Sequence, residues 1–267
     1  MIFETHAHYD DAQFEEDREE LLGKMQSAGI GRIINVGSSI ESSKASLEIA
    51  RKHDFIYAAV GVHPSDIEGL NEETFAWLRQ QTPWEKTVAI GEIGLDYYWD
   101  KEPEVQERQR YWFRRQLELA RETGLPVIIH SRDAAEDTMD YLREFHSETL
   151  TKESHMAENP GVIHCYSYSP EMAKEFIKMG YYIGVGGVVT FKNAKKLVKT
   201  VEEIPIERIL LETDCPYMAP EPNRGTRNNS LNIPYVAAKI ADIKGISVEE
   251  AERITEANAR SVFAKVS

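Results

Sequence analysis

The sequence lacks the features that mark secreted and membrane-spanning proteins. Only two of its 267 residues are cysteines, Cys165 and Cys215, which excludes a disulfide framework. No apolar run approaches the ~18–20 residues that a membrane-spanning helix needs. The N-terminus enters directly into a strand pattern, without the basic and apolar segments of a signal peptide. We therefore expect a cytoplasmic protein, with no membrane contact and no obligate protein partner.

Positive charge is also scarce. The chain carries 31 lysines and arginines against 45 aspartates and glutamates, which gives a net charge of −14 and a pI near 5.1. Such a surface argues against broad, nonspecific binding to nucleic acids or anionic membranes. A substrate that carries phosphate would therefore need local compensation from metal ions or from a few arginines.

Apolar runs alternate with helical patterns along the whole chain. The expected strands are Ile2–His8, Arg32–Val36, Ile56–Val62, Val88–Ile93, Val127–His130, Val162–Cys165, Tyr181–Val185 and Ile209–Asp214. The expected helices are Phe14–Ala28, Ile40–His53, Glu72–Gln80, Pro103–Glu122, Asp133–Phe145, Pro170–Met179, Asn193–Val201, Tyr235–Lys244, Val248–Ala257 and Ala259–Ala264, and the polar segment Ser147–Pro160 is expected to be a long loop.

This alternation of strands and helices predicts the fold class. Eight strand–helix units without a linker predict an α/β protein, a single-domain (β/α)8 TIM barrel over residues 1–267. A doubly wound open sheet is the alternative, but it usually has fewer strands and a glycine-rich turn after the first. Here the first turn reads His8-Tyr9-Asp10-Asp11.

Residues that could bind a metal stand at the carboxyl ends of the expected strands. In a barrel, functional side chains lie at the carboxyl ends of the strands. Five of the eight histidines stand at such ends, together with two acidic residues; the set is His6, His8, His63, Glu92, His130, His164 and Asp214. Each taken alone has a plainer structural interpretation, as a hydrogen-bonded core histidine, a turn residue or a helix cap. Together they indicate a metal site.

Six of these residues are more ligands than one tetrahedral ion needs. A bridging carboxylate with mixed ligands suggests two metals about 3.5–4 Å apart. We expect one metal on His6, His8 and Asp214 and a second on His130 and His164, with Glu92 as the bridge. Imidazole and carboxylate ligands suit Zn, Mn, Ni or Fe(II), and Mg suits a position richer in oxygen.

Six motifs, in this order and over nearly the whole chain, resemble one family. They are Thr5-His6-Ala7-His8, Gly61-Val62-His63-Pro64, Ile90-Gly91-Glu92-Ile93-Gly94-Leu95-Asp96, His130-Ser131-Arg132-Asp133-Ala134, His164-Cys165-Tyr166-Ser167 and Leu211-Glu212-Thr213-Asp214-Cys215-Pro216-Tyr217. The chain resembles the TatD family of metal-dependent deoxyribonucleases, within the amidohydrolase-like barrel superfamily. The resemblance implies the same two-metal assignment for the six residues, and 3′–5′ exonuclease or related DNA-hydrolysing activity, often with Mg or Mn. DNA, as single strands or 3′ ends, is the implied substrate.

The sequence departs from the family pattern at three places. Tyr168 replaces a glycine that usually follows the His-Cys-aromatic-Ser motif, and the family's Arg-Asn-Glu-Pro reads Arg227-Asn228-Asn229-Ser230 here, with Pro234 displaced. The segment Ser147–Pro160 is longer than expected. None of these departures touches an expected ligand, so we expect catalysis to be kept and substrate choice to differ.

Several residues beyond the ligands have expected roles. Asp214 and Glu92 are the expected catalytic carboxylates, with Asp214 accepting the proton of the attacking water. His63 is a candidate for a phosphate contact or a leaving-group acid, or alternatively a structural cap beside Pro64. Glu4 shares a strand face with His6 and His8, and is expected to support the ligands from behind.

The rim of the barrel offers candidate substrate contacts. We expect Arg132, Arg224 and Arg227 to bind phosphate, although each could be a solvated loop charge. The aromatics there could stack on unpaired bases or could pack the loops; they are Tyr97, Tyr98, Trp99, Tyr166 and Tyr168. Cys165 and Cys215 each follow a ligand by one residue, so strand alternation predicts that both are inert core thiols turned away from the metals.

Two other functions stay open on the sequence alone. One is a metal-dependent hydrolase of a small phosphoester, lactone or amide. The other is a barrel that only binds a partner, but a set of buried carboxylates and imidazoles without metal would be costly to maintain.

Overall fold

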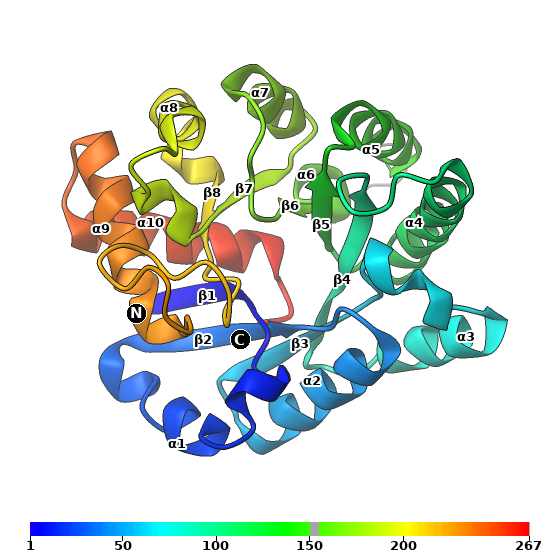
Figure 1. Ribbon diagram of the computed structural model, residues 1–267, viewed down its shortest axis with the longest axis horizontal. Coiled ribbons are helices and arrows are strands. Elements are labelled where there is room, and N and C mark those ends of the chain that lie inside the picture. Colours follow the sequence, from blue (N-terminus) through cyan, green and yellow to red (C-terminus); the bar gives the residue numbers. More distant parts are fainter. Residues whose placement is uncertain (150–154, 267) are drawn as a thin grey trace.

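Eight parallel strands follow one another around a ring in chain order. The computed structural model describes residues 1–149 and 155–266. The strands are β1 (Ile2–Ala7), β2 (Ile30–Val36), β3 (Ile56–Val60), β4 (Thr87–Asp96), β5 (Val127–Arg132), β6 (Gly161–Ile163), β7 (Tyr182–Val185) and β8 (Ile209–Leu211), and each pairs with the next. Figure 1 shows these strands at the centre with the helices around them. This nearly closed barrel confirms the expected single-domain TIM barrel fold.

The first and last strands meet and close the ring. Ala7 forms an isolated parallel bridge with Cys215. The Asp214 amide donates to the His6 carbonyl at 2.9 Å, and the Thr5 hydroxyl donates to the Leu211 carbonyl at 2.9 Å. Residues of the first and the eighth strand segments, about 200 positions apart in the sequence, are therefore held side by side at this seam.

Ten α-helices occur in the described residues; most of the long ones surround the barrel, whereas the last one, Val248–Val262, packs behind β1 and β8 (Figure 1). They are α1 (Arg18–Leu22), α2 (Ile40–Lys52), α3 (Glu72–Gln81), α4 (Pro103–Thr123), α5 (Ala135–Thr149), α6 (His155–Glu158), α7 (Pro170–Lys178), α8 (Lys195–Glu203), α9 (Ile233–Lys244) and α10 (Val248–Val262). None of the helices in this part of the chain is long and apolar enough to cross a lipid bilayer.

Buried apolar side chains fill the barrel at the amino ends of its strands. Phe3 at the beginning of β1 and Phe263 after α10 are both buried, with ring centroids 6.1 Å apart. Both belong to an apolar cluster that takes one or two residues from every strand, including Val162, Tyr182 and Leu210. Side chains therefore fill this end of the barrel, and the open end lies at the carboxyl ends of the strands.

Three sequence-based boundaries were wrong. The segment expected as one helix, Phe14–Ala28, consists of two 3-10 turns and the short α1, because Asp17 leaves the helical backbone at φ −130° and pairs with Arg227. The expected loop Ser147–Pro160 holds the end of α5 and the whole of α6, while its residues 150–154 lie outside the described part. α10 continues through Asn258, whose side chain bonds the Ile206 and Ile209 carbonyls, so two expected helices are one.

Candidate metal centre

The carboxyl ends of the strands surround a cavity of about 570 Å³. His6 lies within β1 and His8 directly after it, Glu92 within β4, His130 within β5 and His164 directly after β6. Asp214 and His63 follow β8 and β3 by three residues. With the exception of His6, which is buried, these residues line the cavity. The structure thus brings all of the expected metal ligands to one place.

Glu92 stands at the centre of this group. One of its oxygens, Oε2, lies 3.3 Å from His6 Nε2 and 3.7 Å from His8 Nε2. The other, Oε1, lies 2.9 Å from His130 Nδ1, 3.9 Å from His164 Nε2 and 3.8 Å from His63 Nε2. The two oxygens of one carboxylate therefore face two different groups of histidines.

The strand that carries Glu92 is irregular at this point. Ile90 pairs with Val127 and Ile93 with Ile129, so Gly91 and Glu92 lie opposite a single residue of β5. An extra residue of this kind is a β-bulge, which redirects side chains locally. Gly94, two residues on, has φ +148°, and a Cβ there would lie 1.9 Å from the His130 carbonyl oxygen. Glycine is thus required for β4 to approach β5 beside the site.

Asp214 is the second shared carboxylate. Its Oδ1 lies 3.3 Å from His8 Nε2 and 3.7 Å from both His6 Nε2 and His164 Nε2. Its backbone is left-handed at φ +56°, a conformation that aspartate tolerates better than most residues. Burial opposes its ionisation, but the neighbouring His164 and His8 lower its pKa below the usual value, so it is ionised at neutral pH.

The hydrogen bonds behind two of the rings fix which nitrogen faces the site. His8 Nδ1 lies 2.8 Å from the Val36 carbonyl and His130 Nε2 lies 3.1 Å from Asp96 Oδ2, and both partners can only accept. In a neutral ring the opposite nitrogen then carries a lone pair. His8 Nε2 faces His6 Nε2 at 3.0 Å, and His130 Nδ1 faces Glu92 at 2.9 Å. Facing lone pairs and carboxylates repel, and a cation between them removes the repulsion.

The electrostatics of the site also favour bound positive charge. Burial lowers the pKa of His164, but Glu212, Glu92 and Asp214 outweigh it and raise that pKa to about 10. Burial likewise opposes protonation of His8, and Asp214 and Glu92 raise its pKa to about 9. The imidazole and carboxylate donors suit divalent transition metals. The residues present therefore fit the expected metal ions.

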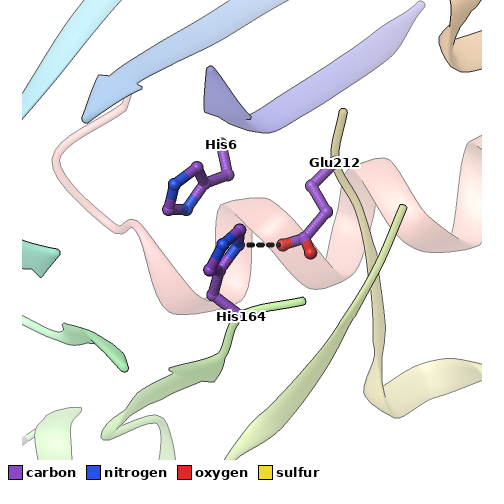
Figure 2. A group of neighbouring side chains, drawn as sticks. All are labelled: His6, His164 and Glu212. Carbon is purple, nitrogen blue, oxygen red and sulfur yellow. Dashed lines mark ion pairs between the residues drawn. The ribbon is translucent and has the colours of Figure 1, made fainter. Parts of the chain in front are cut away.

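Glu212 is a functional side chain that the sequence analysis missed. Figure 2 shows its carboxylate directed at His164, whose ring stacks on that of His6 with centroids 3.5 Å apart. Glu212 Oε2 lies 3.1 Å from His164 Nδ1, and Oε1 accepts from the Cys165 amide at 2.6 Å. A Cβ on Gly184 would lie 2.3 Å from this carboxylate, so β7 leaves room for it. The available signal was the two-residue spacing to Asp214, which would place both carboxylates on one face of a continued strand, although β8 itself ends at Leu211.

Asp96 was missed in the same way. It closes the glycine-containing motif of β4, four residues after Glu92, and the sequence did not show which histidine it would reach. Its Oδ2 lies 3.1 Å from His130 Nε2, and its Oδ1 accepts from the amides of Tyr98 and Trp99. Asp96 and Glu212 thus hold His130 and His164 from behind, as carboxylates commonly do for metal-binding histidines.

His63 differs from the other histidines of the site. Its Nδ1 accepts a hydrogen bond from the Ser65 amide at 3.1 Å, so in the neutral ring the proton is on Nε2. Burial and the nearby His130 lower its pKa to about 4, and the ring is neutral at pH 7. Its distances group it with Glu92 and His130 as a possible ligand set. However, the nitrogen that faces the cavity is a donor, which suits a contact to an anionic substrate.

Glu4 supports the backbone of the site. Its Oε1 accepts from the amides of His6 at 3.2 Å and Thr213 at 2.9 Å, so it joins the first and last strands. Burial raises its pKa to about 8. Its hydrogen bonds to these two amides hold the backbone on which His6 and Asp214 stand.

The three expected phosphate-binding arginines lie in different settings. Arg132 lines the cavity and stacks on Tyr98, with its guanidinium carbon 3.9 Å from the ring centroid. Arg227 instead pairs with Asp17 at 2.5 Å, and Arg224 packs on Phe191 at 4.2 Å. Neither Arg224 nor Arg227 is among the lining residues of the cavity.

The two thiols also differ. Cys215 is buried, as expected. The expectation that Cys165 turns away from the site is wrong: Cys165 lines the cavity, and its sulfur lies within 4.8 Å of ligand atoms of His164 and Asp214. β6 ends at Ile163 and Cys165 has φ +45°, so strand alternation no longer applies there. Burial and the adjacent carboxylates raise the pKa of the Cys165 thiol, which stays protonated.

Known proteins share both the sequence and this architecture. The TatD related DNase family matches residues 3–264. The Bacillus subtilis protein YabD, called an uncharacterized metal-dependent hydrolase, is 43% identical over 98% of this chain and 99% of its own. The Cronobacter sakazakii 3′-5′ ssDNA/RNA exonuclease TatD is 31% identical over 99% and 98%. The crystal structure of YjjV, a TatD homologue from Escherichia coli, superimposes with a TM-score of 0.88 at 30% identity, covering 98% of each chain. The chain therefore belongs to the TatD related DNase family of metal-dependent hydrolases.

Proposed function

We propose that the protein is a deoxyribonuclease that hydrolyses phosphodiester bonds of single-stranded DNA or DNA 3′ ends, as a 3′–5′ exonuclease. One observation carries the proposal: the two oxygens of Glu92 face two groups of histidines, which suits a pair of ions on one phosphate. The exonuclease named among the relatives supports the choice of substrate. The cytoplasmic location expected from the sequence stays a prediction.

The proposed ligands keep the assignment made from the sequence. His6, His8 and Asp214 would hold one divalent ion and His130 and His164 a second, with Glu92 between them. Mg, Mn, Zn, Ni and Fe(II) are the candidate ions. When bound, such ions supply Lewis acidity to the reacting water and phosphate and neutralise their negative charge.

The side chains around the ions perform the remaining steps. Asp214, ionised at neutral pH, accepts the proton of the attacking water. The Nε2–H of His63, which is neutral because its pKa is low, donates a hydrogen bond to a phosphate oxygen rather than acting as an acid. Arg132 adds a positive charge at the edge of the cavity, where it makes no ion pair with a carboxylate of the described residues. Together these groups meet the need for local positive charge on an acidic protein.

A digest of single-stranded DNA tests the proposal. Metal-supplemented wild-type protein should progressively shorten a 5′-labelled oligonucleotide, and EDTA should stop it. Glu92→Ala should abolish turnover and reduce the number of bound ions, measured by metal analysis after dialysis. Glu85→Ala, at an exposed position before β4, is the matched control and should behave as wild type.

Two results would overturn the proposal. Metal-dependent hydrolysis retained in Glu92→Ala would show that Glu92 does not bridge two catalytic ions. Intact DNA together with cleavage of a small phosphoester, lactone or amide would keep the hydrolase and change its substrate.

A further inference from the structure

The five rim aromatics differ in their hydrogen bonds to the rest of the protein and in the fraction of the side chain that is exposed. The Tyr97 hydroxyl donates to Asp137 at 2.6 Å, and that of Tyr168 bonds Ser131 at 2.8 Å. Tyr166 is buried, with its hydroxyl bonded to the Ser169 carbonyl. By contrast, Tyr98 is 42% exposed and Trp99 is 67% exposed. Of the five, these two adjacent rings are exposed, whereas Tyr97 and Tyr168 are half-buried and Tyr166 is buried.

Arg132 joins this exposed pair to the cavity. Its guanidinium carbon lies 3.9 Å from the Tyr98 centroid and 5.4 Å from the Trp99 centroid. The two rings meet edge to face, with centroids 4.7 Å apart. Arg132 itself lines the cavity that holds Glu92 and His130, whereas the two aromatic rings lie outside its lining. The group therefore extends outward from the metal centre, with the positive charge of Arg132 at the cavity and the rings of Tyr98 and Trp99 farther out.

This group is fixed to the metal centre by a short chain of hydrogen bonds. Asp96 Oδ1 accepts from the Tyr98 amide at 2.9 Å and the Trp99 amide at 3.2 Å. The other oxygen of the same carboxylate lies 3.1 Å from His130 Nε2. One buried carboxylate thus sets the position of an expected metal ligand and of the backbone that presents the two rings.

We propose that Tyr98, Trp99 and Arg132 form a stacking site for one unpaired nucleobase next to the phosphate held at the metal centre. This inference rests on the proposed nuclease function and specifies its substrate. A base has an aromatic face whatever its identity, so stacking on Trp99 tolerates any sequence. A base paired in a duplex already stacks on its neighbours and is not free to do so. Arg132 lies between the rings and the cavity, where it can contact the phosphate that links that base to the reacting group.

Equilibrium binding tests the stacking site apart from turnover. The metal-loaded protein is titrated against a fluorescein-labelled phosphorothioate oligothymidylate, which resists hydrolysis, and binding is followed by anisotropy. Trp99→Ala should weaken binding about tenfold or more, the loss expected for one stacked base. Trp99→Phe keeps an aromatic face and should bind nearly as wild type. Tyr235→Ala removes another exposed aromatic, 44% accessible on α9, and should change nothing.

A second ligand separates stacking from phosphate binding. An abasic oligomer of the same length has the same backbone without bases, so wild type and Trp99→Ala should bind it equally weakly. Wild-type affinity in Trp99→Ala, or equal wild-type affinity for the abasic and thymidylate oligomers, would overturn the stacking site. Binding that depends on Trp99 without any cleavage of unmodified DNA would leave the stacking site in place and refute the nuclease. Absence of oligonucleotide binding by wild type would refute both.

Discussion

Replacing Glu212 with glutamine tests how the ring of His164 is held. The native carboxylate accepts from the Cys165 amide at 2.6 Å, and its other oxygen lies 3.1 Å from His164 Nδ1, where its negative charge favours a proton on that nitrogen. A glutamine of the same shape offers one oxygen and one NH₂ group, so it cannot accept from both. If the oxygen keeps the Cys165 amide, the NH₂ group faces His164 Nδ1, which must then accept. The ring proton moves to Nε2, and the nitrogen that faces Asp214 loses its lone pair.

The burial of Glu212 sets the size of the effect. Its side chain is only 1% exposed, so water cannot replace the lost acceptor. Loss of such a supporting partner typically reduces metal affinity by about 10–100-fold, or roughly 1.4–2.7 kcal/mol. We expect Glu212→Gln to weaken the binding of one divalent ion by this amount and to leave the barrel folded, because its shape is unchanged.

Calorimetric titration of the metal-free protein with Mn²⁺ measures this change directly. Glu202→Gln makes the same chemical change at an exposed position near the end of α8 and should leave the affinity unchanged. Circular dichroism and thermal melting establish that all three proteins are folded. Equal Mn²⁺ affinity in folded Glu212→Gln and wild type would refute the argument that Glu212 selects the tautomer of His164.

Three other substitutions test separate parts of the structure. His63→Gln should keep the metal content of wild type and lower kcat/KM on DNA by about 10²–10³-fold, as for other single donors to a reacting anion; loss of a metal ion instead would make His63 a ligand. Lys195 and Lys196 are exposed at the start of α8, beside the cavity-lining Leu197. Changing both to Gln should reduce the slope of log Kd against log salt for single-stranded DNA by about 1.4. An unchanged slope would show that neither lysine contacts the DNA. Phe263→Ala should destabilise the protein by about 3–5 kcal/mol in urea titrations, because it empties the packed end of the barrel; a loss below about 1 kcal/mol would mean that the neighbouring side chains close the gap.

The sequence predicted the barrel and the grouping of the ligands for one physical reason. Parallel strands in a barrel end at the same rim, so residues that close separate apolar runs must meet. His6 and Asp214 are far apart in the chain, yet their strands lie next to each other at the seam. Periodicity alone therefore brought the candidate ligands together without any knowledge of distances.

The details that sequence reasoning missed depend on local backbone geometry and on long-range partners. Cys165 enters the cavity because the chain turns left-handed after β6, which strand alternation does not anticipate. Arg227 forms an ion pair with Asp17, which lies 210 residues earlier in the sequence and interrupts an expected helix. The tautomers of His8 and His63 depend on the Val36 carbonyl and the Ser65 amide, which the residue types do not specify.

The seam between β1 and β8 has a consequence for how the protein is made. Thr5 bonds to Leu211, 206 residues later, and Glu4 bonds to the amide of Thr213. During synthesis from the N-terminus, the first strand therefore has no partner on this side until the last strand has left the ribosome. Its exposed edge and the buried carboxylate of Glu4 must remain in a partly folded chain for most of translation, a period in which such edges are prone to mispairing. His6 and His8 meet Asp214 only after β8 has been made, so the metal centre can assemble only late in synthesis.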